Sequence, residues 1–187
     1  MAFMSDQIII ENCSPTLAGL KTGNLFSCQY ENKDEDLCEV RRLNRFLCKK
    51  GIRIVPVKYY ESRVVLYIYR PKALYRDLND ERANAVLTGL GYRTECTEGC
   101  VAFLGKKMRE KTCREDFPHE VGFFLGYPPT DVIGFMNHPY DCKCVGCWKV
   151  YGDVHKAVKT FDQYKACTRE YLRRYKMGAS LEQLAIG

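Results

Sequence analysis

The chain has 187 residues, of which 46% are hydrophobic and 28% are charged, and its formal net charge is +6. This length and composition are typical of a globular domain, and they exclude a disordered or collagen-like chain. The positive net charge is compatible with binding to phosphate groups, so the placement of the cations along the chain matters.

The N-terminal half contains clear secondary-structure signals. Residues 24–30 predict a short strand, and residues 34–50 predict a helix because apolar side chains recur there at helical spacing before a glycine. Two further strands, at residues 52–59 and 63–69, are separated by a short polar turn. They form the clearest predicted hairpin of the sequence.

Helices are predicted through the middle of the chain, at residues 71–78, about 80–90, and 97 to about 111. Residues 117–137 follow, with Pro118 and Pro129 each at a plausible helix start and several glycines between them. We expect two short helices joined by a turn in this region, which would form a buried corner.

The C-terminal part predicts a strand at residues 147–151, a long helix capped by Asp153 and ending near Lys176, and a short tail element. Many of the basic residues lie in the long helix: Lys156, Lys159, Lys165, Arg169, Arg173, Arg174 and Lys176. Acidic residues interrupt this series and tyrosines occupy the other face, which favours a solvated helix face. Nucleic acid is therefore not an expected partner.

Strands that include a hairpin, without regular alternation of strand and helix, predict an α+β fold. Its small, mainly antiparallel sheet would contain the hairpin at 52–69 and one or two further strands, packed against several helices. No repeat, linker or composition break divides the chain, so we expect a single globular domain over residues 1–187 with a tail element at 178–187.

The sequence also predicts where the protein resides. No apolar run approaches the roughly 20 residues of a membrane-spanning helix, and residues 1–10 lack the pattern of a secretory signal. The cysteine count is 11, an odd number in a chain without an export signal, so we expect mostly free thiols in a reducing compartment. Together these features predict a cytoplasmic protein that does not associate with membranes.

Four segments carry a family resemblance: PTLAGLK at 15–21, FPHEVGFFLGYP at 117–128, DVIGF at 131–135 and WKVYG at 148–152. They resemble a family from anaerobic Gram-positive bacteria that is known as a domain of unknown function. The resemblance covers nearly the whole chain. It implies a setting similar to that of flavodoxin and iron-uptake systems, and hence a redox or metal-homeostasis context.

A cysteine-rich loop is the first candidate site. Cys142, Cys144 and Cys147 lie within six positions, and His138 precedes them by four. Thiolates suit zinc, iron or an iron–sulfur cluster, with His138 or Cys113 as a fourth ligand. The alternative is a loop of ordinary reduced thiols, because the spacing lacks the paired C-x-x-C motifs of a specific zinc site.

A second candidate site combines His119 and Glu120 with Lys21 and Asp131. His119 could act as a general acid or base, oriented by either carboxylate, while Lys21 could bind an anionic substrate group. The structural alternative is that Glu120 stabilises the first turn of a helix and that His119 is a hydrogen-bonded core residue.

A third candidate is Cys13, because Pro15 two residues later suggests the start of a short helix through Lys21. A thiol at a helix N-terminus is a better nucleophile, and His119 could serve as its base. The alternative is a buried structural thiol. Finally, Trp148 and Lys149 could line a ligand pocket, or could simply alternate on a half-buried strand.

These observations favour a cytoplasmic accessory protein that binds a small ligand or a metal in redox or metal homeostasis, with residues 118–131 forming the pocket. Its partners would be a small anionic ligand or a redox protein. The competing hypothesis is an enzyme that uses Cys13, or His119 with Glu120, on an acidic or phosphate-bearing substrate held by Lys21.

Overall fold

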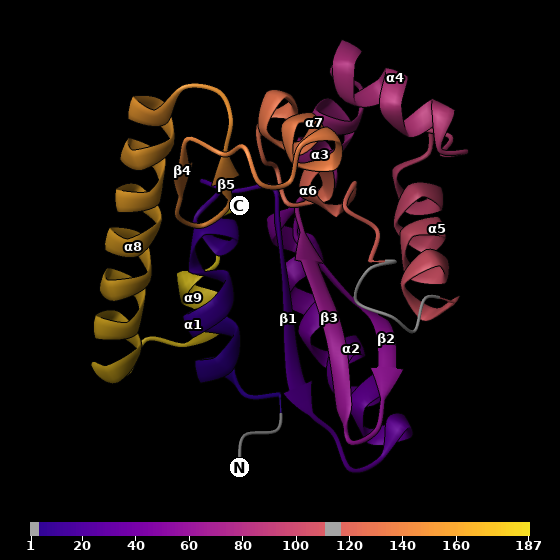
Figure 1. The fold of residues 1–187 in the computed structure, drawn as a ribbon. Coiled ribbons are helices and arrows are strands. Elements are labelled where there is room, and N and C mark those ends of the chain that lie inside the picture. The colour runs from indigo at the N-terminus through magenta and orange to yellow at the C-terminus, as the bar shows by residue number, and fades with distance from the viewer. Residues whose placement is uncertain (1–3, 111–116) are drawn as a thin grey trace.

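The computed structural model describes residues 4–110 and 117–187. Figure 1 shows a three-stranded antiparallel sheet with helices around it, and a separate two-stranded ladder beside α8. The predicted α+β class, a small antiparallel sheet packed against several helices, is confirmed.

The described elements follow the chain in this order: α1 (Asp6–Leu17), β1 (Gly23–Gln29), α2 (Lys33–Leu47), the 3-10 turn η1 (Cys48–Lys50), β2 (Arg53–Tyr60), β3 (Arg63–Tyr69), α3 (Pro71–Leu78), α4 (Glu81–Gly89), α5 (Thr97–Glu110), α6 (Val121–Phe124), α7 (Pro129–Asn137), β4 (Cys144–Val145), β5 (Lys149–Val150), α8 (Val154–Lys176) and α9 (Leu181–Leu184). Most lie within a few residues of the predicted ranges. The predicted end of the third middle helix at Lys111 falls outside the described residues.

The central sheet has the strand order β1-β3-β2. The predicted hairpin joins β2 to β3, and Glu61 at its turn has a positive φ of 49°. Because β2 is an edge strand, it accommodates Pro56, and the pairing register shifts between Pro56 and Lys58. Arg109 of α5 donates to the Val57 carbonyl at 2.9 Å, which attaches α5 to this irregular segment.

Side-chain alternation along the strands divides the core between the two faces of the sheet. On one face, Leu66 and Ile68 of β3 join residues of α1, α2 and α9. On the other, Tyr67 and Tyr69 join residues of α3 to α7. A third, smaller cluster contains Val150, packed against α8. The region of α6, α7 and β5 is therefore supported by two clusters.

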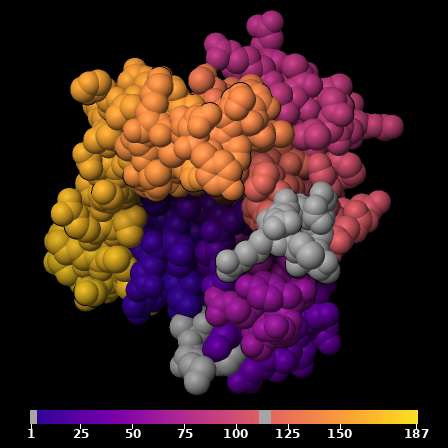
Figure 2. Space-filling model, in the orientation of Figure 1, coloured from indigo at the N-terminus to yellow at the C-terminus, as the bar shows by residue number. Residues whose placement is uncertain are grey.

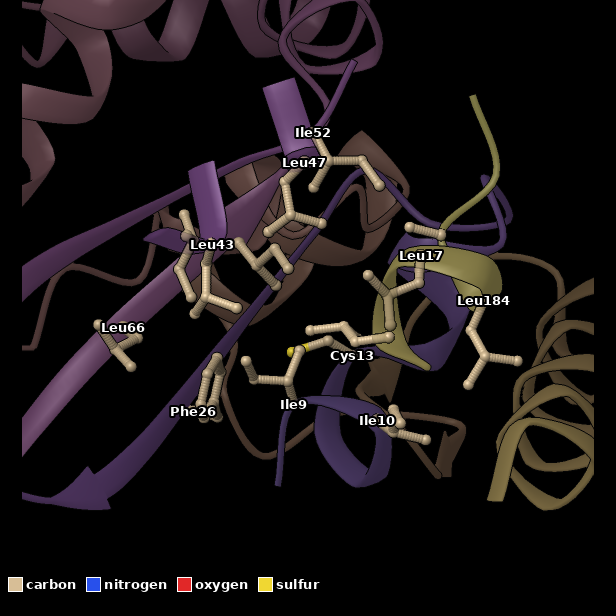
Figure 3. Packing of buried hydrophobic residues seen from close by; sticks show 14 of the residues in the cluster. Ile9, Ile10, Cys13, Leu17, Phe26, Leu43, Leu47, Ile52, Leu66 and Leu184 are labelled. Atoms are coloured by element: carbon tan, nitrogen blue, oxygen red, sulfur yellow. The ribbon is translucent and has the colours of Figure 1, made fainter. Parts of the chain in front are cut away.

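Helix α1 differs from the prediction. It begins after Ser5, whose side chain accepts from the Ile8 amide, and Pro15 lies inside its last turn instead of starting a helix. Apolar residues at helical spacing, including Ile9 and Leu17, bury one side of α1 and determine where it forms. Figure 3 shows Cys13 among these side chains, between α1 and the sheet. The predicted helix start at Pro15 is therefore wrong.

The tail after α8 packs against α1. Leu181 and Leu184 of α9 are buried in the same cluster as α1, and the Ile186 amide donates to the Leu17 carbonyl at 3.0 Å. Ser180 and Gln183 form a capping box at the start of α9. The tail element is thus part of the core on the α1 face of the sheet.

The predicted strand at 147–151 is shorter in the structure. Only Lys149 and Val150 are extended, and they pair with Cys144 and Val145 and not with the central sheet. Figure 2 shows this orange part of the surface standing over a recess whose floor is formed by indigo N-terminal residues. Among residues 4–110 and 117–187, no helix combines the length and apolar character needed to cross a membrane.

Candidate ligand-binding site

A pocket of about 540 Å³ lies among α6, α7 and β5. Most of the side chains around it are apolar or aromatic. Its lining consists of Phe117, His119, Val121, Gly122, Tyr127, Asp131, Val132, Phe135, Trp148 and Lys149. The corner predicted over residues 118–131 supplies many of these residues, and the pocket is closed by Lys149 of β5 and by Trp148, which precedes it.

Two glycines allow the elements around the pocket to approach closely. A Cβ added to Gly122 of α6 would lie 2.7 Å from a methyl group of Val132 in α7. A Cβ added to Gly134 of α7 would overlap the ring of Tyr151, the residue after β5. Gly126, which lies between α6 and α7, has a φ of 73°. Glycine adopts a positive φ without steric strain, so the chain can turn at this position.

Asp131 anchors the β5 segment to α7. Its carboxylate is 3% exposed and accepts from the Trp148 indole at 2.7 Å, the Tyr151 amide at 2.8 Å and the Gly152 amide at 2.7 Å. Both carboxylate oxygens are therefore occupied by protein donors. Asp131 holds the pocket wall in place, and it does not orient His119 as one sequence-based hypothesis required.

An aromatic stack continues the pocket wall. The rings of Trp148 and Tyr127 are 4.8 Å apart between centroids and inclined by 28°, and Phe161 of α8 meets Trp148 edge-on at 4.5 Å. The Tyr127 hydroxyl also donates to the Cys147 carbonyl at 3.3 Å. The indole thus has its position fixed by two rings and by Asp131.

Two basic groups flank Phe135 in the pocket lining. The His119 ring meets the Phe135 ring edge-on with centroids 4.9 Å apart. The Lys149 ammonium lies 5.2 Å from the same ring and donates to the Pro139 carbonyl at 2.7 Å. Within the two described ranges, neither group forms an ion pair with a carboxylate. One wall of an otherwise apolar pocket can therefore attract negative charge.

Glu120 does not face His119. Its carboxylate is 4% exposed, accepts from the Tyr92 hydroxyl at 3.0 Å and forms an ion pair with Lys107 of α5. Burial, followed by the charge of Glu120, raises the pKa of Tyr92 well above its ordinary value. The expected pairing of His119 with Glu120 is therefore not formed, because Glu120 links α5 to the start of α6.

Lys21 lies in the loop after α1 and is 9% exposed. Its ammonium is 5.2 Å from the ring centroid of Tyr127 and 5.9 Å from that of Tyr164. Burial lowers the pKa of Lys21 to about 8, and the negative charges that Cys13 and Cys147 can carry oppose this shift. Lys21 contacts the back of the aromatic stack and does not line the pocket with His119.

Cys13 is fully buried inside α1. Burial raises its pKa far above the ordinary value, and the nearby charge of Lys21 only partly opposes this effect. The environment is therefore the reverse of the activated thiol expected at a helix start. Cys13 belongs to the core cluster of α1 and α2, whereas His119 lines the pocket near α6 and α7, so the expected nucleophile–base pair is not assembled.

The cysteine-rich loop forms the β4–β5 hairpin. Cys144 is opposite Val150 in the ladder and packs near Phe161, while Cys147 lies exposed in the turn. No three His, Cys, Asp or Glu side chains that the structure describes are grouped so that they could hold a metal ion. The expected convergence of Cys142, Cys144 and Cys147 with His138 is thus not formed among the described residues.

The Nδ1 atom of His138 instead lies 3.9 Å from the Oδ2 atom of Asp141, and both side chains are exposed. Cys113, the other proposed fourth ligand, is outside the described residues.

Several residues of the site were not singled out from the sequence. Tyr127 and Phe135 lie within the motifs quoted above, and Phe117 begins one of them. Their signal was the density of aromatic residues beside glycines and prolines. By contrast, Lys107 and Tyr164 gave no such signal, because they lie on long helices and meet their partners only through the tertiary fold.

A family model described as "Protein of unknown function (DUF3793)" matches residues 9–185. The chain belongs to the DUF3793 family. This finding confirms the resemblance to a domain of unknown function. In this DUF3793 chain the matched range includes every residue of the pocket and the whole of the central sheet. No curated protein and no solved structure matches the chain.

Proposed function

We propose that this protein binds a small molecule with an apolar, planar body and one acidic group in the pocket between α6, α7 and β5. The observation that carries the proposal is an aromatic pocket with two basic groups, His119 and Lys149, on either side of Phe135. A volume of about 540 Å³ is in the range typical of sites for small ligands.

The polar groups of the pocket wall already form hydrogen bonds with each other, so we propose that the pocket recognises its ligand by shape and charge. Asp131 and the Trp148 indole already satisfy each other, so they offer few groups for a polar ligand. Aromatic surface is available from Trp148, Tyr127 and Phe135, which can stack against a planar body. An acidic group would find its partners at Lys149 and His119.

Of the two hypotheses drawn from the sequence, a ligand-binding accessory protein and an enzyme, this proposal follows the first. The enzymatic hypothesis relied on Cys13, or on His119 with Glu120, and the buried cysteine and the Glu120–Lys107 ion pair give no support to it. We further propose the cytoplasm as the location and redox or metal homeostasis as the context. The free thiols of the described residues support a reducing compartment.

The pocket can be tested with two fluorescent probes of similar aromatic body, the anionic 8-anilinonaphthalene-1-sulfonate and the neutral N-phenyl-1-naphthylamine. Trp148 is the only tryptophan of the chain, so quenching of its emission by a probe reports binding at this wall. We expect both probes to quench Trp148. Lys149→Gln should weaken the anionic probe about tenfold, as for loss of one charged contact, and leave the neutral probe nearly unchanged.

The matched control is Lys159→Gln on the exposed face of α8, which removes the same charge away from the pocket. If neither probe alters Trp148 emission, the pocket does not bind such ligands. If Lys149→Gln and Lys159→Gln weaken the anionic probe equally, the effect comes from net charge and the proposed charge recognition is wrong.

A further inference from the structure

The turn between α7 and β4 carries Tyr140, which is 90% exposed. Backbone hydrogen bonds hold both ends of this turn. The His138 amide donates to the Gly134 carbonyl of α7 at 2.8 Å, and the Lys143 amide donates to the Val150 carbonyl of β5 at 2.8 Å. The turn is therefore fixed to two walls of the pocket, although almost no burial holds the Tyr140 ring itself in place.

The Tyr140 ring lies beside the ammonium group of Lys149, with 5.8 Å between the nitrogen and the ring centroid. The Phe135 ring of the pocket is 5.2 Å from the same nitrogen, and the Pro139 carbonyl accepts from it at 2.7 Å. Lys149 is thus held by two aromatic rings and one carbonyl oxygen. These contacts stabilise an ammonium group without neutralising its charge.

The acidic residue of the turn does not neutralise Lys149 either. Asp141 follows Tyr140 directly, but its Oδ2 atom lies 3.9 Å from the Nδ1 atom of His138. Within the described ranges, no ion pair joins Lys149 to a carboxylate. Because Lys149 also lines the pocket, its ammonium group is available to the acidic group of a ligand.

We propose that Tyr140 is a positioning residue of the pocket, which holds the Lys149 ammonium group where the acidic group of the ligand binds. This inference rests on the proposed function and adds to it the residue that sets the preference for anionic ligands. A lysine side chain is long and flexible, so a ring on its outer side restricts the positions of its charge. Ordering the side chain before binding reduces the entropy that is lost when the ligand binds.

The test uses the full chain, the two naphthalene probes and the variants Tyr140→Leu and Tyr140→Phe. Leucine removes the aromatic ring and keeps an apolar side chain, whereas phenylalanine keeps the ring and loses only the hydroxyl. Tyr140→Leu should weaken binding of the anionic probe about threefold, as for loss of one cation–π contact at an exposed site, and leave the neutral probe nearly unchanged. Tyr140→Phe should bind both probes as the unaltered protein does.

The matched control is Tyr75→Leu, at an exposed position of α3 that does not line the pocket. It should leave the affinity for both probes unchanged. A double substitution tests whether Tyr140 acts through Lys149, because adding Tyr140→Leu to Lys149→Gln should then cause no further loss of affinity for the anionic probe. A further threefold loss in the double variant would show that Tyr140 acts independently of Lys149, and it would overturn the proposal.

A measurement on the ligand-free protein checks the contact itself. In the NMR spectrum, the ε-methylene protons of Lys149 should be displaced by the ring currents of Phe135 and Tyr140. Tyr140→Leu should move this signal towards the ordinary position of a lysine, and Tyr140→Phe should retain the displacement. A signal that is the same in Tyr140→Leu and in the unaltered protein would contradict the positioning role.

Failure of this inference can be distinguished from failure of the proposed function. If both probes quench Trp148 and Tyr140→Leu binds the anionic probe as tightly as the unaltered protein does, the pocket stands and the role of Tyr140 is wrong. If neither probe quenches Trp148 in the unaltered protein, the proposed function fails, and the role of Tyr140 in selecting the ligand fails with it.

Discussion

At Lys21 a primary amine lies against two tyrosine rings with almost no solvent exposure. Cation–π contacts compensate only part of the hydration that an ammonium loses on burial, which is why its pKa falls to about 8 from an ordinary value of 10.5. The protonated amine is therefore less favourable in the folded state than in the unfolded state. Retaining it lowers stability at neutral pH.

Lys21→Met should consequently stabilise the fold at pH 7, by up to about 3 kcal/mol according to the linkage between pKa and stability. Below the folded pKa of about 8 both states of the wild-type amine are protonated and the cost is complete. As pH rises from 8 to 10.5 the folded amine becomes neutral first, so wild-type stability rises relative to the variant and the difference shrinks.

Urea denaturation of both proteins across this pH range measures the difference, in which titrations common to the two proteins cancel. A difference that stays constant with pH would contradict the assigned cost of burying the charge. Lys159→Met on the exposed face of α8 provides the control, for which we expect a flat and small difference.

At the scale of elements, the β5 segment is too short to hold itself in place. Two residue pairs form its ladder, and a ladder of this size is marginal in water. Asp131 of α7 provides the missing connection through its bonds to the Trp148 indole and to two backbone amides. The pocket wall is therefore positioned by a helix and not by its own strand.

Asp131→Ala should destabilise the protein by about 2–4 kcal/mol, because three part-buried donors lose their acceptor. Urea denaturation measures this loss. The emission of Trp148 in the folded variant should shift to longer wavelength as the indole becomes more hydrated. Asp162→Ala, at an exposed position of α8, should leave both quantities unchanged, and an equal effect of the two substitutions would contradict the anchoring role of Asp131.

At the scale of the whole molecule, Arg70 connects three distant parts of the chain. It follows β3 and donates to the carbonyls of Thr16 and Leu17 at the end of α1, and to that of Ile186 in the tail, each at 2.7 Å. These carbonyls lie at chain ends and turns where helix bonding does not satisfy all of them. One guanidinium thus joins the sheet, α1 and the tail.

Arg70→Met should loosen the tail without altering the opposite face of the sheet. We expect the free energy of unfolding to fall by about 2–3 kcal/mol, as for the loss of charged hydrogen bonds. We also expect the substitution to accelerate amide hydrogen exchange more in residues 181–186 than in α5. Arg41→Met, an exposed substitution on α2, is the control. Uniformly faster exchange throughout the chain would show that Arg70 acts on global stability and not on the tail.

Local sequence signals determined much of this fold. Apolar periodicity with a following glycine located α2, alternation around a polar turn located the β2–β3 hairpin, and Asp153 marked the start of α8. These features depend on neighbours within a few residues, so the sequence specifies them directly. The sequence signal at Pro15 predicts the start of a helix there, whereas Pro15 lies inside α1, because burial against α8 and the sheet outweighs one lost backbone bond.

For the candidate site, the sequence by itself determined that residues 117–137 contain two short helices joined by a turn and that Lys149 belongs to a short extended segment. Only the tertiary structure decided the partners. Glu120 meets Lys107, Asp131 meets Trp148, and Lys21 meets Tyr127. The physical reason is that hydrogen bonds, charges and burial act between residues close in space, and these pairs are brought together by the packing of separate elements around the sheet.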